Sequence, residues 1–326
     1  MIYTVTLNPA LDKTVEIPSL TPGSVNRIVS MRTDPGGKGI NVSKVIAQLG
    51  GKSIAVGILG GAVGRSIKNA LENMSIESDF LFVEGETRTN LKIIDPVNHT
   101  NTDINEPGVA VSEEILQELL ERLIARIVPG DLVVLSGSLP LGAPADIYRS
   151  WVKACRLKGA KVFLDVDGAL LGVGVQASPY LIKPNEHELR AMLGQRLETV
   201  EELAEAAHGL CKQYGISKIV VSLGADGALY VTEEETIRAR GLKVPVGSTV
   251  GAGDSVVAAM AVAEERGMSL VDAVRLSTAT GAANVMCSGS QAAEYAQIEE
   301  LMPKVVIRYS PGFGSCAPHN SVPAPA

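Results

Sequence analysis

Cysteine is scarce in this 326-residue sequence, whose 4 cysteines are Cys155, Cys211, Cys287 and Cys316. They stand far apart and form no Cys-x-x-Cys pair, so neither a disulfide framework nor a zinc site is indicated. Basic runs are also absent, and the formal net charge is −7. This balance argues against nucleic acid or an acidic membrane surface as the main partner, so any bound anion must be held by local groups.

Long hydrophobic runs are missing as well. The apolar stretches, for example Ile54–Leu59 and Val256–Ala263, are too short to span a bilayer. The first residues lack the charged and then apolar pattern of a secretory signal. We therefore expect a cytoplasmic protein with no membrane partner.

The sequence does have a 46% apolar content, which can fill a large core. Short β-rich apolar runs predict strands at Tyr3–Leu7, Ile54–Ile58, Leu132–Leu135, Lys161–Leu164, Tyr180–Ile182 and Lys218–Ser222. Between them, 3.6-residue patterns predict helices at Gly39–Leu49, Gly64–Asn73, Ser112–Ile127, Pro144–Leu157, Val200–Gln213 and Asp254–Arg266. This alternation predicts an α/β fold, with a mostly parallel sheet covered by helices on both faces.

Two segments break the alternation, residues 12–33 and 87–106. The second contains the alternating run Asn90–Ile94, and both are expected to form exposed β-structure inserted into the α/β body. Residues 1–310 therefore form a single expected domain. The remaining residues, 311–326, are rich in Pro, Gly and Ser without periodicity, which predicts a disordered tail.

A glycine-rich turn, Gly251-Ala252-Gly253, precedes Asp254 and a small apolar helical run. Its glycines allow a ligand to approach the backbone, and free N–H groups at a helix start attract negative charge. Asp254 is placed to accept a proton, so the turn is equipped for phosphoryl transfer. The alternative is an ordinary loop–helix junction with an acidic cap.

A second double glycine, Gly36-Gly37, leads through Lys38 into a helix carrying Asn41 near its start. This pattern suits a hinge beside a polar ligand, or a purely structural turn. Two other glycine motifs do not hold. Gly51-Lys52-Ser53 lacks the earlier glycine of a P-loop, and Gly172–Ala177, although spaced like a dinucleotide fingerprint, does not link a strand to a helix.

Lys183-Pro-Asn185 follows a predicted strand, at the carboxyl edge where open parallel sheets bind ligands. Asn185 and Glu188 are three residues apart on a starting helix, so they share a face and can orient a hydrated cation. The alternative is a polar helix start with its usual acidic first turn.

Three cations lie in or beside the inserted segments, Arg27, Lys38 and Arg88. Together they are able to clamp a phosphate, although each alone would be an ordinary solvated charge. Ser138, in a Ser-Gly-Ser-Leu-Pro run that ends another strand, is a candidate ligand contact. It does not complete the Gly-x-Ser-x-Gly pattern of a hydrolase.

Taken in order, six motifs resemble those of the ribokinase-like carbohydrate kinases, up to about Val306. They are Asn8–Asp12, Gly36–Val42, Ser136–Pro140, Lys183–Leu189, Val221–Gly224 and Thr249–Ser255. The opening Thr-Leu-Asn-Pro-Ala-x-Asp and the Gly-Gly-Lys-Gly-Ile-Asn-Val run are similar to the phosphosugar branch. Within this branch, Thr102–Gly108 looks most like the members that act on fructose 1-phosphate.

The resemblance implies a ribokinase-like three-layer α/β core with a mostly parallel central sheet and a small β-sheet lid, formed by residues 12–33 and 87–106. The lid would close over the sugar and form a homodimer contact. The implied activity is ATP- and Mg²⁺-dependent phosphorylation of a small phosphosugar, foremost D-fructose 1-phosphate to fructose 1,6-bisphosphate. Fructose 6-phosphate and tagatose 6-phosphate are the alternative acceptors. A non-catalytic sugar-phosphate-binding protein and a Rossmann dehydrogenase are the rival classes.

The resemblance also assigns roles to residues. Asp254 would be the base, and the N–H groups of Gly251, Ala252 and Gly253 would stabilise the transferred phosphoryl group. The sugar and its phosphate would contact Asp12, Arg27, Gly36, Gly37, Lys38, Asn41, Arg88, Asn90 and Ser138. ATP would lie beside Lys183, Asn185, Ser222, Gly224, Gly227, Thr249, Gly253 and Asn284. Asn185 and Glu188 would hold Mg²⁺ through water, and a monovalent cation such as K⁺ would bind near the anion hole.

Overall fold

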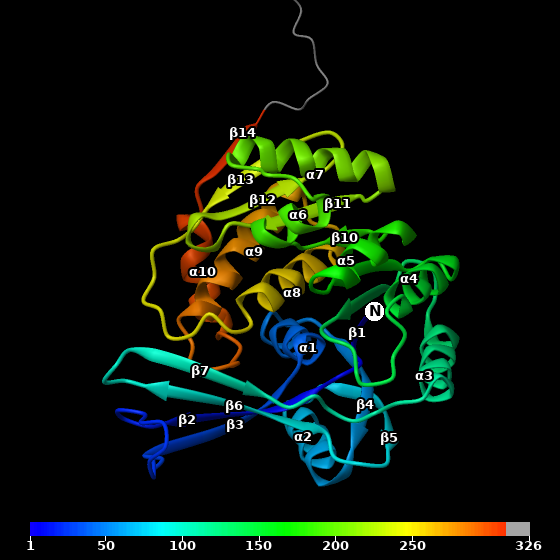
Figure 1. The fold of residues 1–326 in the computed structure, drawn as a ribbon. Coiled ribbons are helices and arrows are strands. Elements are labelled where there is room, and N and C mark those ends of the chain that lie inside the picture. The colour runs from blue at the N-terminus through cyan, green and yellow to red at the C-terminus, as the bar shows by residue number, and fades with distance from the viewer. Residues whose placement is uncertain (311–326) are drawn as a thin grey trace, which may run out of the picture.

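The computed structural model describes residues 1–310, so the predicted disordered tail at 311–326 lies outside the described residues. Its centre is a 10-stranded sheet, ordered β14-β13-β12-β11-β10-β9-β8-β1-β4-β5 (Figure 1). The strands are β1 (Ile2–Thr6), β4 (Ser53–Gly60), β5 (Glu77–Val83), β8 (Leu132–Ser136), β9 (Lys161–Asp165), β10 (Leu181–Ile182), β11 (Lys218–Ser222), β12 (Gly227–Val231), β13 (Thr236–Arg240) and β14 (Ile307–Ser310). From β5 to β11 all pairs are parallel, and β12 to β14 continue as an antiparallel edge, which confirms the predicted mostly parallel sheet.

Helices cover both faces of this sheet (Figure 1). One face carries α3 (Glu113–Arg126), α4 (Ile147–Leu157), α5 (Ala169–Gly174), α6 (Glu186–Leu193) and α7 (Val200–Tyr214). The other carries α1 (Lys38–Gln48), α2 (Gly61–Asn73), α8 (Ala252–Glu265), α9 (Leu270–Val285) and α10 (Tyr295–Leu301). Three 3₁₀ turns are η1 (Val175–Ala177), η2 (Gly224–Asp226) and η3 (Met302–Lys304). Gly172 and Gly174 both lie in α5, and η1 follows directly, so this motif does not link a strand to a helix.

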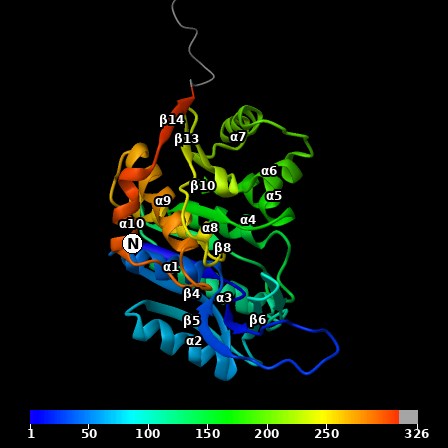
Figure 2. The same ribbon diagram turned by 90° about the vertical axis from the view of Figure 1, so that its left-hand side faces the viewer.

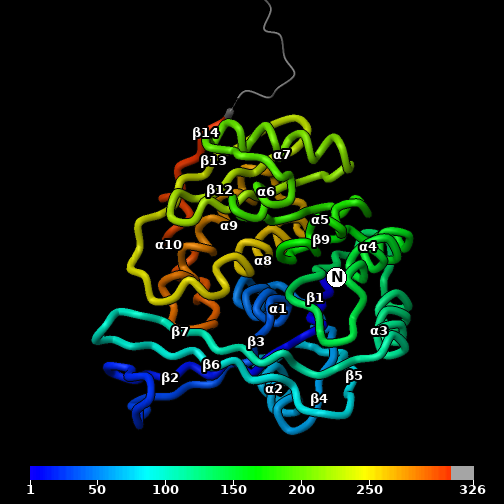
Figure 3. The backbone as a smooth tube through the Cα atoms, viewed as in Figure 1, coloured from blue at the N-terminus to red at the C-terminus, as the bar shows by residue number. Residues whose placement is uncertain are grey.

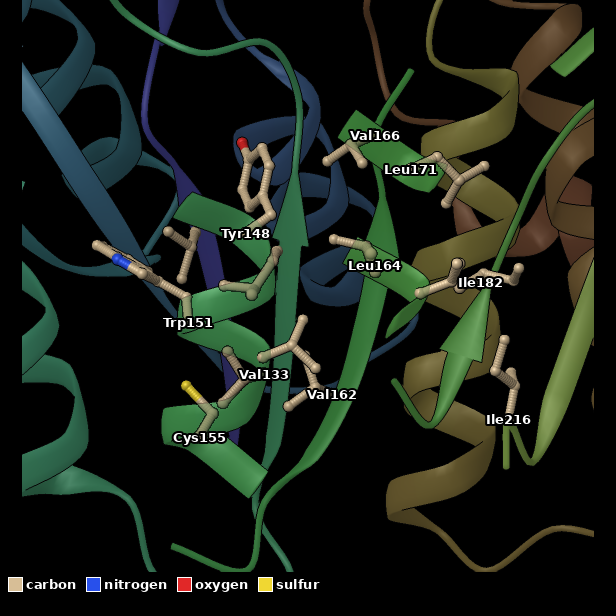
Figure 4. Close-up of a cluster of buried hydrophobic side chains, with 14 of the residues drawn as sticks. Val133, Tyr148, Trp151, Cys155, Val162, Leu164, Val166, Leu171, Ile182 and Ile216 are labelled. Atoms are coloured by element: carbon tan, nitrogen blue, oxygen red, sulfur yellow. The ribbon is translucent and has the colours of Figure 1, made fainter. Parts of the chain in front are cut away.

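The helix spacing explains how each layer packs. On α4, Tyr148, Trp151 and Cys155 recur on one face at helical spacing, and all are buried. Figure 4 shows them beside Val133 and Val162, which point from the strands toward the helix. Alternate residues of each strand point to opposite faces, so each strand contributes to two cores.

The two inserted segments form a separate four-stranded sheet, which we call the lid. Its order is β3-β2-β6-β7, with β2 (Ala10–Glu16), β3 (Ser30–Gly36), β6 (Arg88–Asp95) and β7 (Thr100–Asn105). Val15, Ile17 and Ile93 give the lid a small core of its own. Figure 3 follows the chain from β1 into the lid and back into α1, and Figure 2 shows the long β2–β3 connection extending away from the body. The predicted inserted β-structure is confirmed.

Within residues 1–310, no helix has both the length and the apolar character needed to cross a membrane.

Candidate active site

A cavity of about 570 Å³ lies between the lid and the carboxyl edge of the large sheet. From the lid side it is lined by Asp12, Thr14, Arg88, Asn90, Leu91, Lys92, Asp103 and Asn105. From the core it is lined by Gly37, Lys38, Asn41, Ser138, Asp165, Asp167, Lys183, Gly251, Gly253 and Asp254, among others. The lid and the glycine-rich turn, distant in sequence, thus share one polar chamber. This is the position that open parallel sheets use for ligands.

The glycine-rich turn opens α8 at this chamber. Gly251 has φ 76°, in the left-handed region that favours glycine, and the helix begins at Ala252. A Cβ added to Gly253 would lie 2.9 Å from Nζ of Lys183. A lysine ammonium therefore lies against a helix start, where the first backbone N–H groups have no acceptor within the helix itself. The arrangement suits a phosphoryl group.

Asp254 lies in the first turn of α8 and is only 6% exposed. Nδ2 of Asn41 donates to its Oδ2 at 2.9 Å. Burial, followed by repulsion from Asp165, raises the pKa of Asp254 to about 6. A carboxylate with a pKa near neutrality is a stronger proton acceptor than an exposed one, and it is still ionised at pH 7.

Lys38 lines the cavity, but its partners differ from the predicted phosphate. Its Nζ donates to Asp167 at 2.6 Å and lies 3.7 Å from Asp165. Burial alone would lower the pKa of Lys38, yet the attraction of these carboxylates outweighs burial and raises the pKa. Asp165 also lies 3.4 Å from Nζ of Lys183. Two carboxylates pair with Lys38 in this structure, and its contact with the substrate phosphate stays a prediction.

On the lid side, Arg88 connects β6 to the first motif. Its Nη2 donates to the carbonyl of Asn8 at 2.9 Å and lies 3.4 Å from Oγ of Ser138. Within residues 1–310, its buried Nε donates to no acceptor. Next to it, Nδ2 of Asn90 donates to Oδ1 of Asp12 at 3.1 Å. These side chains present several donors and one carboxylate to the cavity.

The hinge glycines lie at the cavity edge. Gly37 has φ 106°, and Gly36 is so close to the Asp12 carboxylate that a Cβ there would overlap it. Both positions therefore need glycine.

Arg27 does not join this group. It is exposed in the connection between β2 and β3, and it does not line the cavity of its own chain. Within one chain Arg27 therefore lies apart from Lys38 and Arg88, and its contact with the substrate phosphate stays a prediction. Proximity to the lid in sequence does not say which side of the lid a loop residue faces.

Of the residues assigned to ATP, Lys183 and Gly253 line the cavity, and the others do not. Asn185 forms an isolated bridge with Ser222 at the end of β11, and Nδ2 of Asn284 donates to the carbonyl of Val250 at 3.3 Å. Thr249 accepts from the N–H of Ala252 at 3.4 Å. These contacts gather the proposed ATP residues around the glycine-rich turn.

Two of these ATP residues are glycines near η2. Gly227 has φ 102° and packs against the carbonyl of Ala239, so the backbone conformation and the lack of space both explain a glycine at this position. Gly224 also has positive φ, at 58°, and nothing lies within 4 Å of a Cβ added there.

The predicted Mg²⁺ pair is engaged in a capping box. Oδ1 of Asn185 accepts from the N–H of Glu188, and Oε2 of Glu188 accepts from the N–H of Asn185, both at 2.8 Å. Burial, with Asp167 adding repulsion, raises the pKa of Glu188. Within residues 1–310, no group of three His, Cys, Asp or Glu could hold a metal ion. The donor set still fits Mg²⁺, which keeps several waters and takes one or two carboxylates together with substrate phosphates.

The sequence interpretation missed two kinds of residue. Asp165 and Asp167 follow the predicted strand 161–164, so the rule that placed Lys183 at the sheet edge also applies to them. Lys44, by contrast, carries no motif signal and is buried beside Asn41. Only the fold shows its position.

Comparisons with known proteins agree with this geometry. The family model of the pfkB family carbohydrate kinases matches residues 5–296. The chain is 37% identical over 307 residues to 1-phosphofructokinase of Bacillus subtilis, covering 94% of this chain and 99% of that protein. It is 37% identical over 291 residues to D-tagatose-1-phosphate kinase of Bacillus licheniformis, covering 89% and 94%. A structure of phosphofructokinase-2 from Escherichia coli in complex with potassium has TM-score 0.88 and 31% identity, covering 93% of this chain and 98% of that one.

The chain belongs to the pfkB family of carbohydrate kinases. Its enzyme class is that of sugar kinases, which transfer a phosphoryl group to a hydroxyl. The Rossmann dehydrogenase is thereby excluded.

Proposed function

We propose that this enzyme transfers the γ-phosphoryl group of ATP to the C6 hydroxyl of D-fructose 1-phosphate, giving fructose 1,6-bisphosphate and ADP. The proposal rests on one observation: Asp254, at the start of α8, and Arg88 of the lid both line one cavity of about 570 Å³. One wall supplies a base and an anion site, and the other supplies donors for the phosphate already on the sugar. The names of the Bacillus subtilis relative and of the tagatose 1-phosphate enzyme support a ketose phosphorylated at C1.

Asp254 takes the proton of the C6 hydroxyl as that oxygen attacks the γ-phosphorus and the bond to ADP breaks. The raised pKa of the carboxylate, about 6, keeps it both ionised at neutral pH and basic enough for this step. The N–H groups of Gly251, Ala252 and Gly253, with Lys183 beside them, stabilise the charge on the transferred group. In phosphoryl transfer, such positioning and electrostatics supply most of the catalysis.

Arg88 binds the phosphate at C1 through its Nε–H and the guanidinium N–H groups that face the cavity. Because Nη2 is held by the Asn8 carbonyl, the guanidinium is already oriented before substrate arrives. Asp12 and Asn90, bonded to each other, bind sugar hydroxyls, and Asn41 and Ser138 complete that wall.

ATP binds along Asn185, Ser222, Gly224, Thr249 and Asn284, outside the sugar chamber. Asn185 and Glu188 would hold Mg²⁺ through water, and the ion would neutralise charge on the ATP phosphates. A monovalent cation such as K⁺ is proposed near the anion hole, in keeping with the potassium named for the phosphofructokinase-2 structure.

The outer surface of the lid is the proposed homodimer contact. Its exposed apolar side chains include Val25 at 83%, Val29 at 61%, Met31 at 58% and Ile104 at 53% exposure. Such a group on a small sheet favours an interface between two copies of the chain.

Tagatose 1-phosphate is the second candidate acceptor, favoured by the Bacillus licheniformis relative, and the 6-phosphates of fructose and tagatose follow. An assay of ADP release with these four sugars and with unphosphorylated fructose tests the proposal. The highest kcat/KM is expected for fructose 1-phosphate, and Asp254→Asn should keep at most about a hundredth of the wild-type activity at the same protein concentration. Preference for a 6-phosphate would reject the proposed acceptor, and the absence of ADP release with any sugar would reject the kinase activity.

A further inference from the structure

Lys44 is a buried lysine, 6% exposed, in the second turn of the motif helix α1. Its Nζ donates to three oxygens: the carbonyl of Pro35 at 3.0 Å, Oδ1 of Asn41 at 3.1 Å and the carbonyl of Ser290 at 2.6 Å. Pro35 is in β3 beside the hinge glycines, and Ser290 lines the cavity from the loop after α9. One ammonium therefore joins the lid, the motif helix and a distant loop.

The contact with Asn41 has a directional consequence. An amide has one acceptor side and one donor side. Because Lys44 donates to Oδ1 of Asn41, the Nδ2 group must face the other way, where it donates to Asp254 at 2.9 Å. A flipped amide would place its carbonyl oxygen against the Asp254 carboxylate and its N–H groups against an ammonium.

The charges around the pair are mixed. Facing Lys44 are Asp34, Asp12, Asp254 and Arg32, and facing Asp254 are Asp165, Lys38 and Lys183 in addition to Asn41. Burial lowers the pKa of Lys44 to about 8, although the three carboxylates oppose this effect. Burying an ammonium is costly, so its three hydrogen bonds must recover most of the cost.

We propose that Lys44 is a positioning residue for the phosphoryl transfer: it fixes the amide of Asn41 so that this amide holds Asp254 as a base, and it ties that arrangement to the lid hinge. The inference rests on the function proposed above. Lys44 does not touch the reacting atoms, and it acts through Asn41.

The test compares Lys44→Met with wild type by the pH profile of kcat, using the acceptor that wild type turns over fastest. Loss of the oriented hydrogen bond should move the acid limb of the profile upward by about one pH unit. Misplacement of the base should lower kcat at its optimum by about 10- to 100-fold. Lys44→Gln, which keeps a donor, should recover part of both effects.

A structural control separates positioning from folding. Lys218→Met removes a partly buried lysine that pairs with Glu264, remote from the cavity, so it should lower Tm without moving the acid limb. A double-mutant cycle adds the decisive comparison: in an Asn41→Ala background, Lys44→Met should have little further effect on kcat.

An unmoved acid limb in Lys44→Met, or full additivity with Asn41→Ala, would overturn the proposal. If Lys44→Met does not fold, Lys44→Gln carries the same comparison. Failure of the proposed function is distinguishable, because wild type would then release no ADP with any of the sugars.

Discussion

Oδ1 of Asp165 lies 3.4 Å from Nζ of Lys183, and Lys183 in turn lies against Gly253 at the start of α8. The carboxylate therefore holds the lysine at the anion site, and it also raises the pKa of Asp254 by repulsion. A single buried carboxylate thus acts on both the proposed phosphoryl-binding cation and the proposed base.

Asp254→Asn should lower kcat by about 10²–10⁴-fold while leaving ATP and sugar binding largely intact. In wild type, activity should fall as pH drops through about 6, because the protonated carboxyl cannot accept a proton. Steady-state kinetics and calorimetric binding check both statements. A near-normal kcat would remove Asp254 from the role of base.

The same substitution should stabilise the fold. The pKa of Asp254 is raised from 3.8 to about 6, so ionisation of this carboxyl opposes folding. The free energy of unfolding of wild type therefore falls as pH rises from about 4 to 6. At pH 7.5, Asp254→Asn should therefore gain up to about 3 kcal/mol in the free energy of unfolding. The gain should shrink at pH 4, and an equal gain at both pH values would argue against the burial cost.

Arg88→Ala should cost about 1.5–3 kcal/mol in kcat/KM for fructose 1-phosphate, the loss expected for a charge-assisted hydrogen bond. The kcat/KM for unphosphorylated fructose should change little, since this sugar has no phosphate for Arg88 to bind. Arg65→Ala, an exposed arginine on α2, is the matched control and should leave both acceptors unchanged. Equal losses for both acceptors would assign Arg88 to support of the lid instead.

Glu188→Gln should raise the Mg²⁺ concentration needed for half-maximal activity much more than the sugar KM. The chain offers a matched control, because Glu202 forms the same capping box with Thr199 at the start of α7. Glu202→Gln alters an equivalent cap that does not line the cavity, so it should leave the Mg²⁺ dependence unaltered. An unchanged Mg²⁺ requirement in Glu188→Gln would show that the residue only caps its helix.

Glu264, at the end of α8, should be a stability residue. Burial alone would raise its pKa, but hydrogen bonds from Lys161 and Lys218, both 2.5 Å, and from Tyr180 hold it to about 2. The ionised Glu264 contributes fully to the free energy of unfolding above its ordinary pKa of 4.5. This contribution is lost as pH falls from 4.5 toward 2.

At pH 7, Glu264→Gln should therefore lose on the order of 3 kcal/mol in urea unfolding, and the gap to wild type should narrow as the pH is lowered. Glu300→Gln breaks an exposed pair with Lys304 and should cost much less, because solvent screens that pair. A pH-independent gap would contradict the ionic origin.

Val29→Asp should disrupt the proposed dimer, because it puts a charge on the apolar outer surface of the lid. Light scattering after size exclusion measures the mass of the species. Leu157→Asp replaces an apolar residue that is 79% exposed at the end of α4 and should leave the mass unchanged. A wild-type protein that elutes as a monomer at micromolar concentration would reject the interface.

Sequence patterns predicted the regular parts of the fold because periodicity and turn chemistry are local. β11 was predicted at Lys218–Ser222 with its bounds as observed, and α1 and α7 within a residue or so. The interpretation missed α9, whose run of small residues has weak amphipathic contrast because it is buried almost all round. It also missed β5 and β14, which lie at the edges of the sheet.

The site was predictable where it follows a motif and not where it depends on packing. Gly251–Asp254 and Gly36–Asn41 were placed correctly in one cavity because they are contiguous motifs. Which charges pair with each other was not predictable, since Lys38 meets Asp167 only after β9 and α1 are packed. The same reason explains why Lys44 was overlooked.

The position of β1 has a consequence for how the chain reaches its native state. This first strand lies inside the large sheet, where Ile2 pairs with Ser53 on one side and with Leu132 on the other. The parallel pair of β2 and β6 in the lid likewise joins two separate excursions of the chain. Contacts between residues so far apart in sequence make folding slow, because the entropy of closing long loops is lost before the strand contacts stabilise the structure. During synthesis on a ribosome, β1 can pair on its second edge only after β8 has emerged. The parallel pair of β2 and β6 in the lid likewise cannot form until β6 has emerged.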